Sequence, residues 1–170
     1  MRILGAVLAG GRSTRFGSDK AHALIGGERL IDRVAESIEN QCDALIVCGR
    51  EEAGYSCVPD LPASDLGPLG GLNAALAHAA ANGFSHVLSV PCDAPNLPRT
   101  LAQKLIGEGA AIAENQPVIG LWPANLSDDL ASFVGEGGRA LYRFADRAKA
   151  RQIGFDPPLA NINRPADLPG

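Results

Sequence analysis

The amino-terminal segment constrains the fold more than any other part of the chain. Residues 3–9 form an unbroken apolar run, ILGAVLA, which ends at the pair Gly10-Gly11. An apolar run of this length is typical of a strand that is buried on both faces, as the inner strands of a parallel sheet are. The segment therefore predicts an α/β protein whose first strand lies inside the sheet.

The rest of the chain repeats an alternation of strand and helix. Further apolar runs, which we expect to be strands, lie at Ala44–Cys48, His86–Val90, Ala110–Ala113 and Pro117–Trp122. We expect helices at about Leu30–Asn40, Gly71–Asn82, Arg99–Gly107, Asn125–Val134 and Arg139–Lys149. Strands that alternate with helices imply right-handed βαβ crossovers, and hence a three-layer, doubly wound α/β fold with a mainly parallel sheet. The 170 residues fit one domain of this kind, spanning 1–170.

Charge and cysteine content exclude several classes of protein. The chain has 15 Lys and Arg against 19 Asp and Glu, which argues against broad nucleic-acid binding because that requires a basic face. The four cysteines form no CxxC pair and no zinc-type spacing. No apolar run approaches the roughly 20 residues that cross a bilayer, and no signal-peptide pattern precedes the cysteines. We therefore expect a cytoplasmic protein with free thiols and no membrane partner.

The segment after the first predicted strand, LAGGRSTRFGSDKA at residues 8–21, carries the strongest functional signal. Its glycines allow the backbone to turn tightly and to approach a ligand closely. Successive backbone N–H groups in such a loop bind anions, and Arg15 and Lys20 add positive charge suited to phosphate. The spacing fits neither the Walker A loop nor the GxGxxG fingerprint. A surface loop with incidental basic residues is the alternative, although a glycine pair that ends a buried strand favours a phosphate-binding segment.

Asp93 is a second candidate, because it directly follows the strand predicted at His86–Val90. In open α/β sheets, ligands bind at the carboxyl ends of the strands. A carboxylate at that edge can hold Mg²⁺ together with substrate phosphates, as this hard cation prefers oxygen ligands. Its alternative role is to form a turn or to cap the next helix.

These motifs, together with two others, resemble those of the molybdenum cofactor guanylyltransferases, a branch of the NTP-transferase proteins with a glycosyltransferase-A-like fold. The additional motifs are GPLGG at residues 67–71 and NINRP at residues 161–165. The resemblance implies transfer of GMP from GTP to the phosphate of molybdopterin, with release of pyrophosphate and with Mg²⁺ as cofactor. Because the acceptor phosphate is already ionised near neutral pH, the reaction needs no general base. The three histidines, at 22, 78 and 86, show no catalytic spacing, and we expect them to be structural.

The resemblance also assigns site residues. It implies a catalytic role for Arg15, Lys20 and Asp93, with Asp93 as the metal ligand. The residues implied to bind the nucleotide are Leu8, Ala9, Gly10, Gly11, Lys20, Cys48, Asp60, Gly70 and Asp93. For Asp60, a role in a solvated surface loop is the alternative.

The acceptor side and the choice of base rest on fewer residues. The resemblance implies that Arg139, Asn161 and Asn163 contact the acceptor, although Arg139 can equally be a surface residue, and the two amides can form local turn bonds before Pro165. Cys48 stands where the guanylyltransferases often have Asn, and a thiol is a much weaker hydrogen-bonding group. Use of CTP, or of a sugar phosphate as acceptor, is therefore an alternative, as is a non-catalytic nucleotide-binding regulatory module. We expect a monomer that binds GTP and a molybdopterin-type acceptor, with molybdoenzyme-maturation proteins as further partners.

Overall fold

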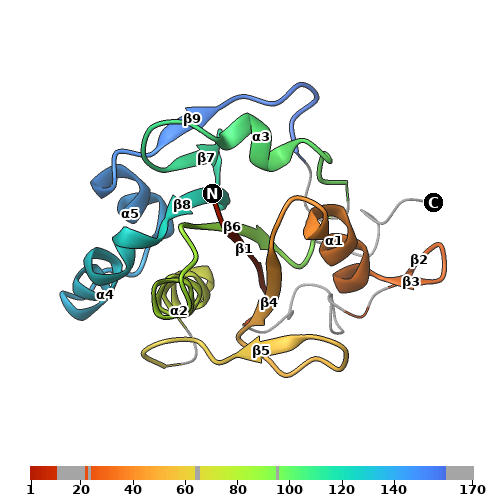
Figure 1. Cartoon of the computed structure of the whole chain (residues 1–170), viewed down its shortest axis with the longest axis horizontal. Coiled ribbons are helices and arrows are strands. Elements are labelled where there is room, and N and C mark those ends of the chain that lie inside the picture. Colours follow the sequence, from red (N-terminus) through yellow and green to blue (C-terminus); the bar gives the residue numbers. More distant parts are fainter. Residues whose placement is uncertain (11–21, 23, 64–65, 95, 160–170) are drawn as a thin grey trace.

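Strands and helices alternate in the computed structural model, which describes residues 1–10, 22, 24–63, 66–94 and 96–159 (Figure 1). The strands are β1 (Ile3–Leu8), β2 (Leu24–Ile25), β3 (Glu28–Arg29), β4 (Ala44–Cys48), β5 (Ser56–Val58), β6 (His86–Pro91), β7 (Ala111–Ala113), β8 (Gln116–Pro123) and β9 (Arg151–Ile153). The helices are α1 (Leu30–Glu39), α2 (Pro68–Ala81), α3 (Leu101–Leu105), the 3₁₀ helix η3 (Ala124–Leu126), α4 (Ser127–Gly135) and α5 (Leu141–Arg147).

Seven strands form one sheet in the order β5-β4-β1-β6-β8-β7-β9. β1 pairs in parallel with both β4 and β6, and β4 pairs in parallel with β5. β8 runs antiparallel to its neighbours β6 and β7, whereas β7 and β9 are parallel. Among the described strands of this sheet, β8 alone opposes the common direction. The prediction of a mainly parallel, doubly wound sheet is confirmed.

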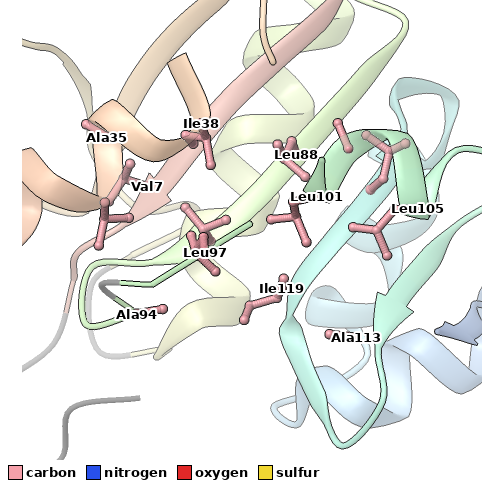
Figure 2. Close-up of a cluster of buried hydrophobic side chains, with 14 of the residues drawn as sticks. Val7, Ala35, Ile38, Leu88, Ala94, Leu97, Leu101, Leu105, Ala113 and Ile119 are labelled. Atoms are coloured by element: carbon pink, nitrogen blue, oxygen red, sulfur yellow. The ribbon is translucent and has the colours of Figure 1, made fainter. Parts of the chain in front are cut away.

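Helices cover both faces of the sheet and make the fold three layers deep. Side chains alternate across a strand, so that Val7 of β1 belongs to the core on the face of α1 and α3, whereas Leu8 belongs to the core on the face of α2, α4 and α5. Figure 2 shows the first of these two cores, in which Val7 and Leu88 of the sheet lie close to Ile38 of α1 and Leu101 of α3. β1 is buried at every position, as its unbroken apolar run predicted.

The predicted helices all form, and their ends differ from the predicted bounds by up to three residues. α2 begins at Pro68 rather than Gly71, because proline is favoured in the first turn, where its missing N–H is not needed. α3 is shorter than predicted at both ends. α5 begins at Leu141 rather than Arg139, since Ala140 is extended and Gly137 has a φ of +98°. None of the helices in the described part of the chain has the length and apolar character needed to cross a bilayer.

Candidate active site

The carboxyl ends of β4, β1 and β6 meet at one edge of the sheet. Leu8, at the end of β1, pairs with Cys48 of β4 and with Pro91 of β6. Two hydrogen bonds extend this register beyond the strands: Ala9 N donates to Cys48 O at 2.9 Å, and Cys92 N donates to Leu8 O at 3.3 Å. The three loops that leave these strands therefore start side by side. This edge is where open α/β sheets bind ligands.

Asp60 is enclosed by four glycines at this edge, which we call the glycine cage: Gly10, Gly49, Gly70 and Gly71. A Cβ atom on Gly10 would lie 2.7 Å from Asp60 Oδ2, and one on Gly49 would lie 2.8 Å from Oδ1. A Cβ atom on Gly70 would lie 3.2 Å from Asp60 Cβ, and one on Gly71 would be in ordinary contact with Oδ1 at 3.5 Å. Side chains at the first two positions would displace the carboxylate, so glycine lets the backbone approach it closely.

Gly49 satisfies two requirements at once. Its φ is +93°, a conformation that residues with a Cβ rarely adopt. In addition, a Cβ atom there would lie 2.6 Å from Gly10 Cα, so the loops after β1 and β4 could not come together. Gly49 was not among the predicted site residues, although a glycine directly after a buried strand is a recognisable signal for such a turn.

The carboxylate of Asp60 lies in an unfavourable environment for its charge. Its Oδ1 atom is buried and has no hydrogen-bond partner among the described residues. Burial also raises the pKa of the Asp60 carboxyl above its ordinary value. A cavity of about 190 Å³ opens beside it and is lined by Gly49, Arg50, Glu51, Val58, Pro59 and Asp60. A buried acceptor without a donor destabilises the folded protein. A ligand that enters this cavity and donates a hydrogen bond to the Asp60 carboxylate would remove this destabilisation.

Asp93 is held at the same edge by the hydrophobic core. The residue is only 8% exposed, and its Oδ1 atom is buried. Ala94 and Leu97, which follow it, are buried beneath α1 and α3, and both are labelled in Figure 2. The buried side chains of Ala94 and Leu97 thus anchor the loop that carries Asp93 and keep this residue at the end of β6.

The donor set of Asp93 fits a metal that is shared with a substrate. In the described part of the chain, no group of three or more His, Cys, Asp or Glu side chains could hold a metal ion by itself. Mg²⁺ needs no such group, because it is commonly bound by one or two carboxylates together with waters and substrate phosphates. The structure is therefore compatible with Asp93 as a ligand of such an ion and gives no support for an all-protein metal centre within the described residues.

Other predicted nucleotide contacts lie at this edge with their side chains turned into the core. Leu8 and Ala9 are 7% and 5% exposed, so only their backbone groups could face a ligand. Cys48 is completely buried, and burial raises the pKa of its thiol to about 12. Its contact with a nucleotide stays a prediction that the buried thiol does not favour. Gly70 lies in the first turn of α2, and its carbonyl accepts a hydrogen bond from Leu61 N at 3.2 Å.

The predicted acceptor contact Arg139 lies between α4 and α5 rather than within a helix. Its guanidinium donates to Val134 O at 3.1 Å and to Gly138 O at 2.6 Å, an arrangement that satisfies carbonyl groups at the end of α4. These two bonds give Arg139 a structural role outside a helix, and its contact with the acceptor stays a prediction. The remaining predicted site residues lie outside the described residues: Gly11, Arg15, Lys20, Asn161 and Asn163.

Comparisons with known proteins identify the family of the chain. The family model of the MobA-like NTP transferase domain matches residues 5–152. The molybdenum cofactor guanylyltransferase of Sinorhizobium fredii is 36% identical over 194 residues, which cover 98% of this chain and 89% of the relative. That of Cereibacter sphaeroides is 37% identical and covers 99% of this chain and 94% of the relative.

Solved structures share the fold at lower identity. Molybdopterin-guanine dinucleotide biosynthesis protein A from Archaeoglobus fulgidus superposes with a TM-score of 0.76 at 21% identity, over 96% of this chain and 94% of that one. The 2-C-methyl-D-erythritol 4-phosphate cytidylyltransferase of Thermus thermophilus superposes with a TM-score of 0.72 at 14% identity, over 98% of this chain and 94% of that one. Family model and sequence relatives together show that the chain belongs to the MobA-like NTP transferase family.

Proposed function

We propose that this chain is a molybdenum cofactor guanylyltransferase, which transfers GMP from GTP to the phosphate of molybdopterin and releases pyrophosphate. The observation that carries the proposal is the edge of the sheet where the glycine cage and Asp60 lie beside the loop of Asp93. The curated relatives described above bear the name of this activity. Their similarity extends over nearly the whole chain and therefore includes this edge.

The charges of the site residues suggest how GTP is oriented. A carboxylate accepts hydrogen bonds and repels phosphate oxygens, which are themselves acceptors. Asp60 therefore suits the ribose hydroxyls or the N–H groups of guanine, and the cavity beside it suits the nucleoside. Arg15, Lys20 and the backbone N–H groups of Gly10 and Gly11 suit the triphosphate. Gly70, in the first turn of α2, would lie on the nucleoside side with Asp60.

The reaction requires alignment and charge compensation more than covalent help from the protein. An oxygen of the acceptor phosphate attacks the α-phosphorus of GTP, and the bond from that phosphorus to the β-phosphate bridging oxygen breaks. Because the second pKa of a phosphate monoester is near 6, the attacking oxygen is ionised without a general base. Arg15 and Lys20 would hold the phosphates in line and offset the charge that develops on the leaving pyrophosphate. Mg²⁺ bound by Asp93 would supply further charge compensation to the phosphate oxygens.

The acceptor would bind on the side of the edge that leads away from Asp60. We include Arg139, Asn161 and Asn163 in this part of the proposal. Arg139 supplies a fixed positive charge, and the two amides can both donate and accept hydrogen bonds, as a pterin requires.

Two measurements test the proposed function. The first is a thermal-shift series with GTP, ATP, CTP and UTP, each with Mg²⁺ and each with EDTA, in which we expect GTP with Mg²⁺ to raise the melting temperature most. The second is pyrophosphate release with GTP and molybdopterin, for which Lys20→Ala should lower the rate by about 10²-fold, the scale of one lost transition-state contact. The largest shift with CTP would refute guanylyl transfer. Absence of pyrophosphate release with every nucleotide would favour the non-catalytic binding module.

A further inference from the structure

Arg50 lines the cavity beside Asp60, which the proposed function assigns to the nucleoside. The cavity measures about 190 Å³, whereas a closed cavity of about 150 Å³ holds a benzene ring. It is therefore large enough to take up much of a base. Val58 and Pro59 supply apolar surface for the faces of a planar ring, and charged side chains supply polar groups for its edges.

The charged side chains in this lining differ in the hydrogen bonds that they can make. Glu51 and Asp60 are carboxylates, which accept hydrogen bonds when they are ionised, whereas a guanidinium has N–H donors and no acceptor. Among the described residues that line the cavity, Arg50 has the only side chain that donates. Within this lining, the acceptor atoms of a base would thus meet Arg50, and the donor groups of a base or a ribose would meet the two carboxylates.

Arg50 is held in the cavity wall from both sides. Before it in the chain, Gly49 N donates to Val58 O at 2.9 Å, so the turn after β4 is bound to the end of β5. The Nε atom of Arg50 lies 3.3 Å from Oε1 of Glu52, whose side chain is only 3% exposed. Glu52 N in turn donates to Cys57 Sγ at 3.2 Å. A side chain that is fixed before the ligand arrives loses little conformational entropy on binding.

Guanine presents the acceptors that a fixed guanidinium recognises. Its O6 and N7 atoms lie side by side, and bidentate donation from arginine to this pair is the commonest specific contact to guanine in protein–DNA complexes. Adenine carries an amino group in place of O6, and the exposed edge of cytosine also carries one. Both bases would therefore present a donor to the donor groups of Arg50, and the cavity would favour guanine over either.

The predicted nucleotide contact Cys48 is poorly suited to this task. Its side chain is completely buried, and a thiol is a weak hydrogen-bonding group. Arg50 follows it by two residues and lies beyond the turn at Gly49, where it lines the cavity. The connection after β4 can thus recognise a base through Arg50 although the strand itself ends in a buried thiol.

We propose that Arg50 selects guanine by donating hydrogen bonds to O6 and N7 of the base in the cavity beside Asp60. The inference rests on the proposed function, in which the nucleoside occupies this cavity. Asp60 and Glu51 then accept hydrogen bonds from the ribose hydroxyls and from the N–H groups of guanine. Because Arg50 contacts the base and not the reacting phosphates, its loss should raise the Kd of GTP and change kcat less.

The test combines a change in the protein with a change in the base. Titration calorimetry with Mg²⁺ gives the Kd of GTP and of 7-deaza-GTP, in which a C–H group replaces N7. We expect the wild type to bind GTP about 10-fold more tightly than the analogue, the scale of one hydrogen bond to a charged group. Arg50→Met has no donor and should bind the two nucleotides within about 2-fold of each other. Arg143→Met, the same change at an exposed position of α5, is the control and should keep the wild-type ratio.

Arg50→Lys keeps the test decisive should Arg50→Met fail to fold. Lysine retains the positive charge next to Glu52 but lacks the planar fork of donors, so the preference for GTP over 7-deaza-GTP should fall to about 3-fold or less. A wild-type ratio in either variant, or equal affinities of the wild type for the two nucleotides, would overturn the role of Arg50 and leave guanylyl transfer standing. A GTP preference that depends on Arg50, without pyrophosphate release from GTP and molybdopterin, would support the base selection and refute the transfer reaction.

Discussion

The carboxylate of Asp60 should reduce the stability of the folded protein, and Asp60→Asn should reveal by how much. A buried acceptor without a partner costs about 1–3 kcal/mol. Since Asp60 is only partly buried as a whole, we expect the lower end, about 1 kcal/mol. Asparagine can keep a neutral oxygen in the position of Oδ1 and turn its amide nitrogen toward the cavity. For a chain of this size, about 1 kcal/mol corresponds to a melting temperature higher by roughly 2–4 °C.

The advantage of the asparagine variant should depend on pH in one direction. Burial raises the pKa of Asp60 in the folded state above the value in the unfolded chain. The folded state therefore holds the proton more tightly, and the stability that this provides is complete at low pH and lost as the pH rises through the folded pKa. Below about pH 4 the carboxyl is protonated in both states, so variant and wild type should converge. The difference should be fully developed at neutral pH.

The same substitution should weaken nucleotide binding. GTP at 100 times its Kd stabilises a protein by about 2.7 kcal/mol, and a tenfold weaker Kd at the same concentration reduces this to about 1.4 kcal/mol. The assay is a thermal melt at several pH values, with and without GTP and Mg²⁺. Asp146→Asn, the same change at an exposed position of α5, is the control and should be nearly neutral. An Asp60→Asn protein that melts below the wild type at neutral pH, and that gains as much from GTP, would refute the reasoning.

Two further substitutions test the glycine cage and the metal site. Gly49→Ala and Gly54→Ala impose a similar backbone strain, at φ values of +93° and +91°. A Cβ atom at Gly54 meets nothing within 4 Å, whereas one at Gly49 meets Gly10 Cα. Gly54→Ala should therefore cost about 1 kcal/mol in a urea melt and Gly49→Ala clearly more, with loss of GTP binding; equal costs would argue against the clash. Asp93→Asn should keep its melting temperature and lose most activity, with partial recovery at high Mg²⁺ or Mn²⁺ in initial-rate measurements. An early melt with full activity per folded molecule would place Asp93 in the scaffold.

The sequence predicted the parts of the fold that follow from local pattern. β1, β4 and β6 are long apolar runs, and α1 repeats its apolar residues at helical spacing, so each forms close to its predicted bounds. The prediction missed β2, β3, β5 and β9, which are only two or three residues long. The described residues of these strands are not fully buried, so the strands lack the apolar runs that predict buried strands. They form because a partner strand pairs with them, and the local sequence does not predict that partner.

The candidate site divides in the same way. Gly10 and Asp93 stand next to apolar runs that the sequence shows directly, Asp60 was implied by the family resemblance, and the fold brings all three to one edge of the sheet. Buried Glu52 contacts His22 and Arg29, and no local pattern predicts these contacts, because the two residues lie 30 and 23 positions away from it in the sequence. Only the tertiary structure shows that a histidine expected to be structural contacts a buried carboxylate.

The buried carboxylate of Glu52 and the partly buried carboxylate of Asp60 have opposite surroundings, and the contrast bears on function. Glu52 lies within ion-pair distance of three basic side chains, whereas Asp60 Oδ1 has no hydrogen-bond partner among the described residues. Glu52 shows that this fold can surround a carboxylate with basic side chains. Asp60 lacks such partners among the described residues, and an acceptor without a donor destabilises the folded protein. A ligand that supplies the missing hydrogen-bond donors would explain why Asp60 is kept despite this destabilisation. The ribose and the base of a nucleotide both carry such donors. Under the proposed function, the basic residues of the glycine-rich segment would bind the phosphate end, and the two sets of charges together would orient GTP for attack at its α-phosphorus.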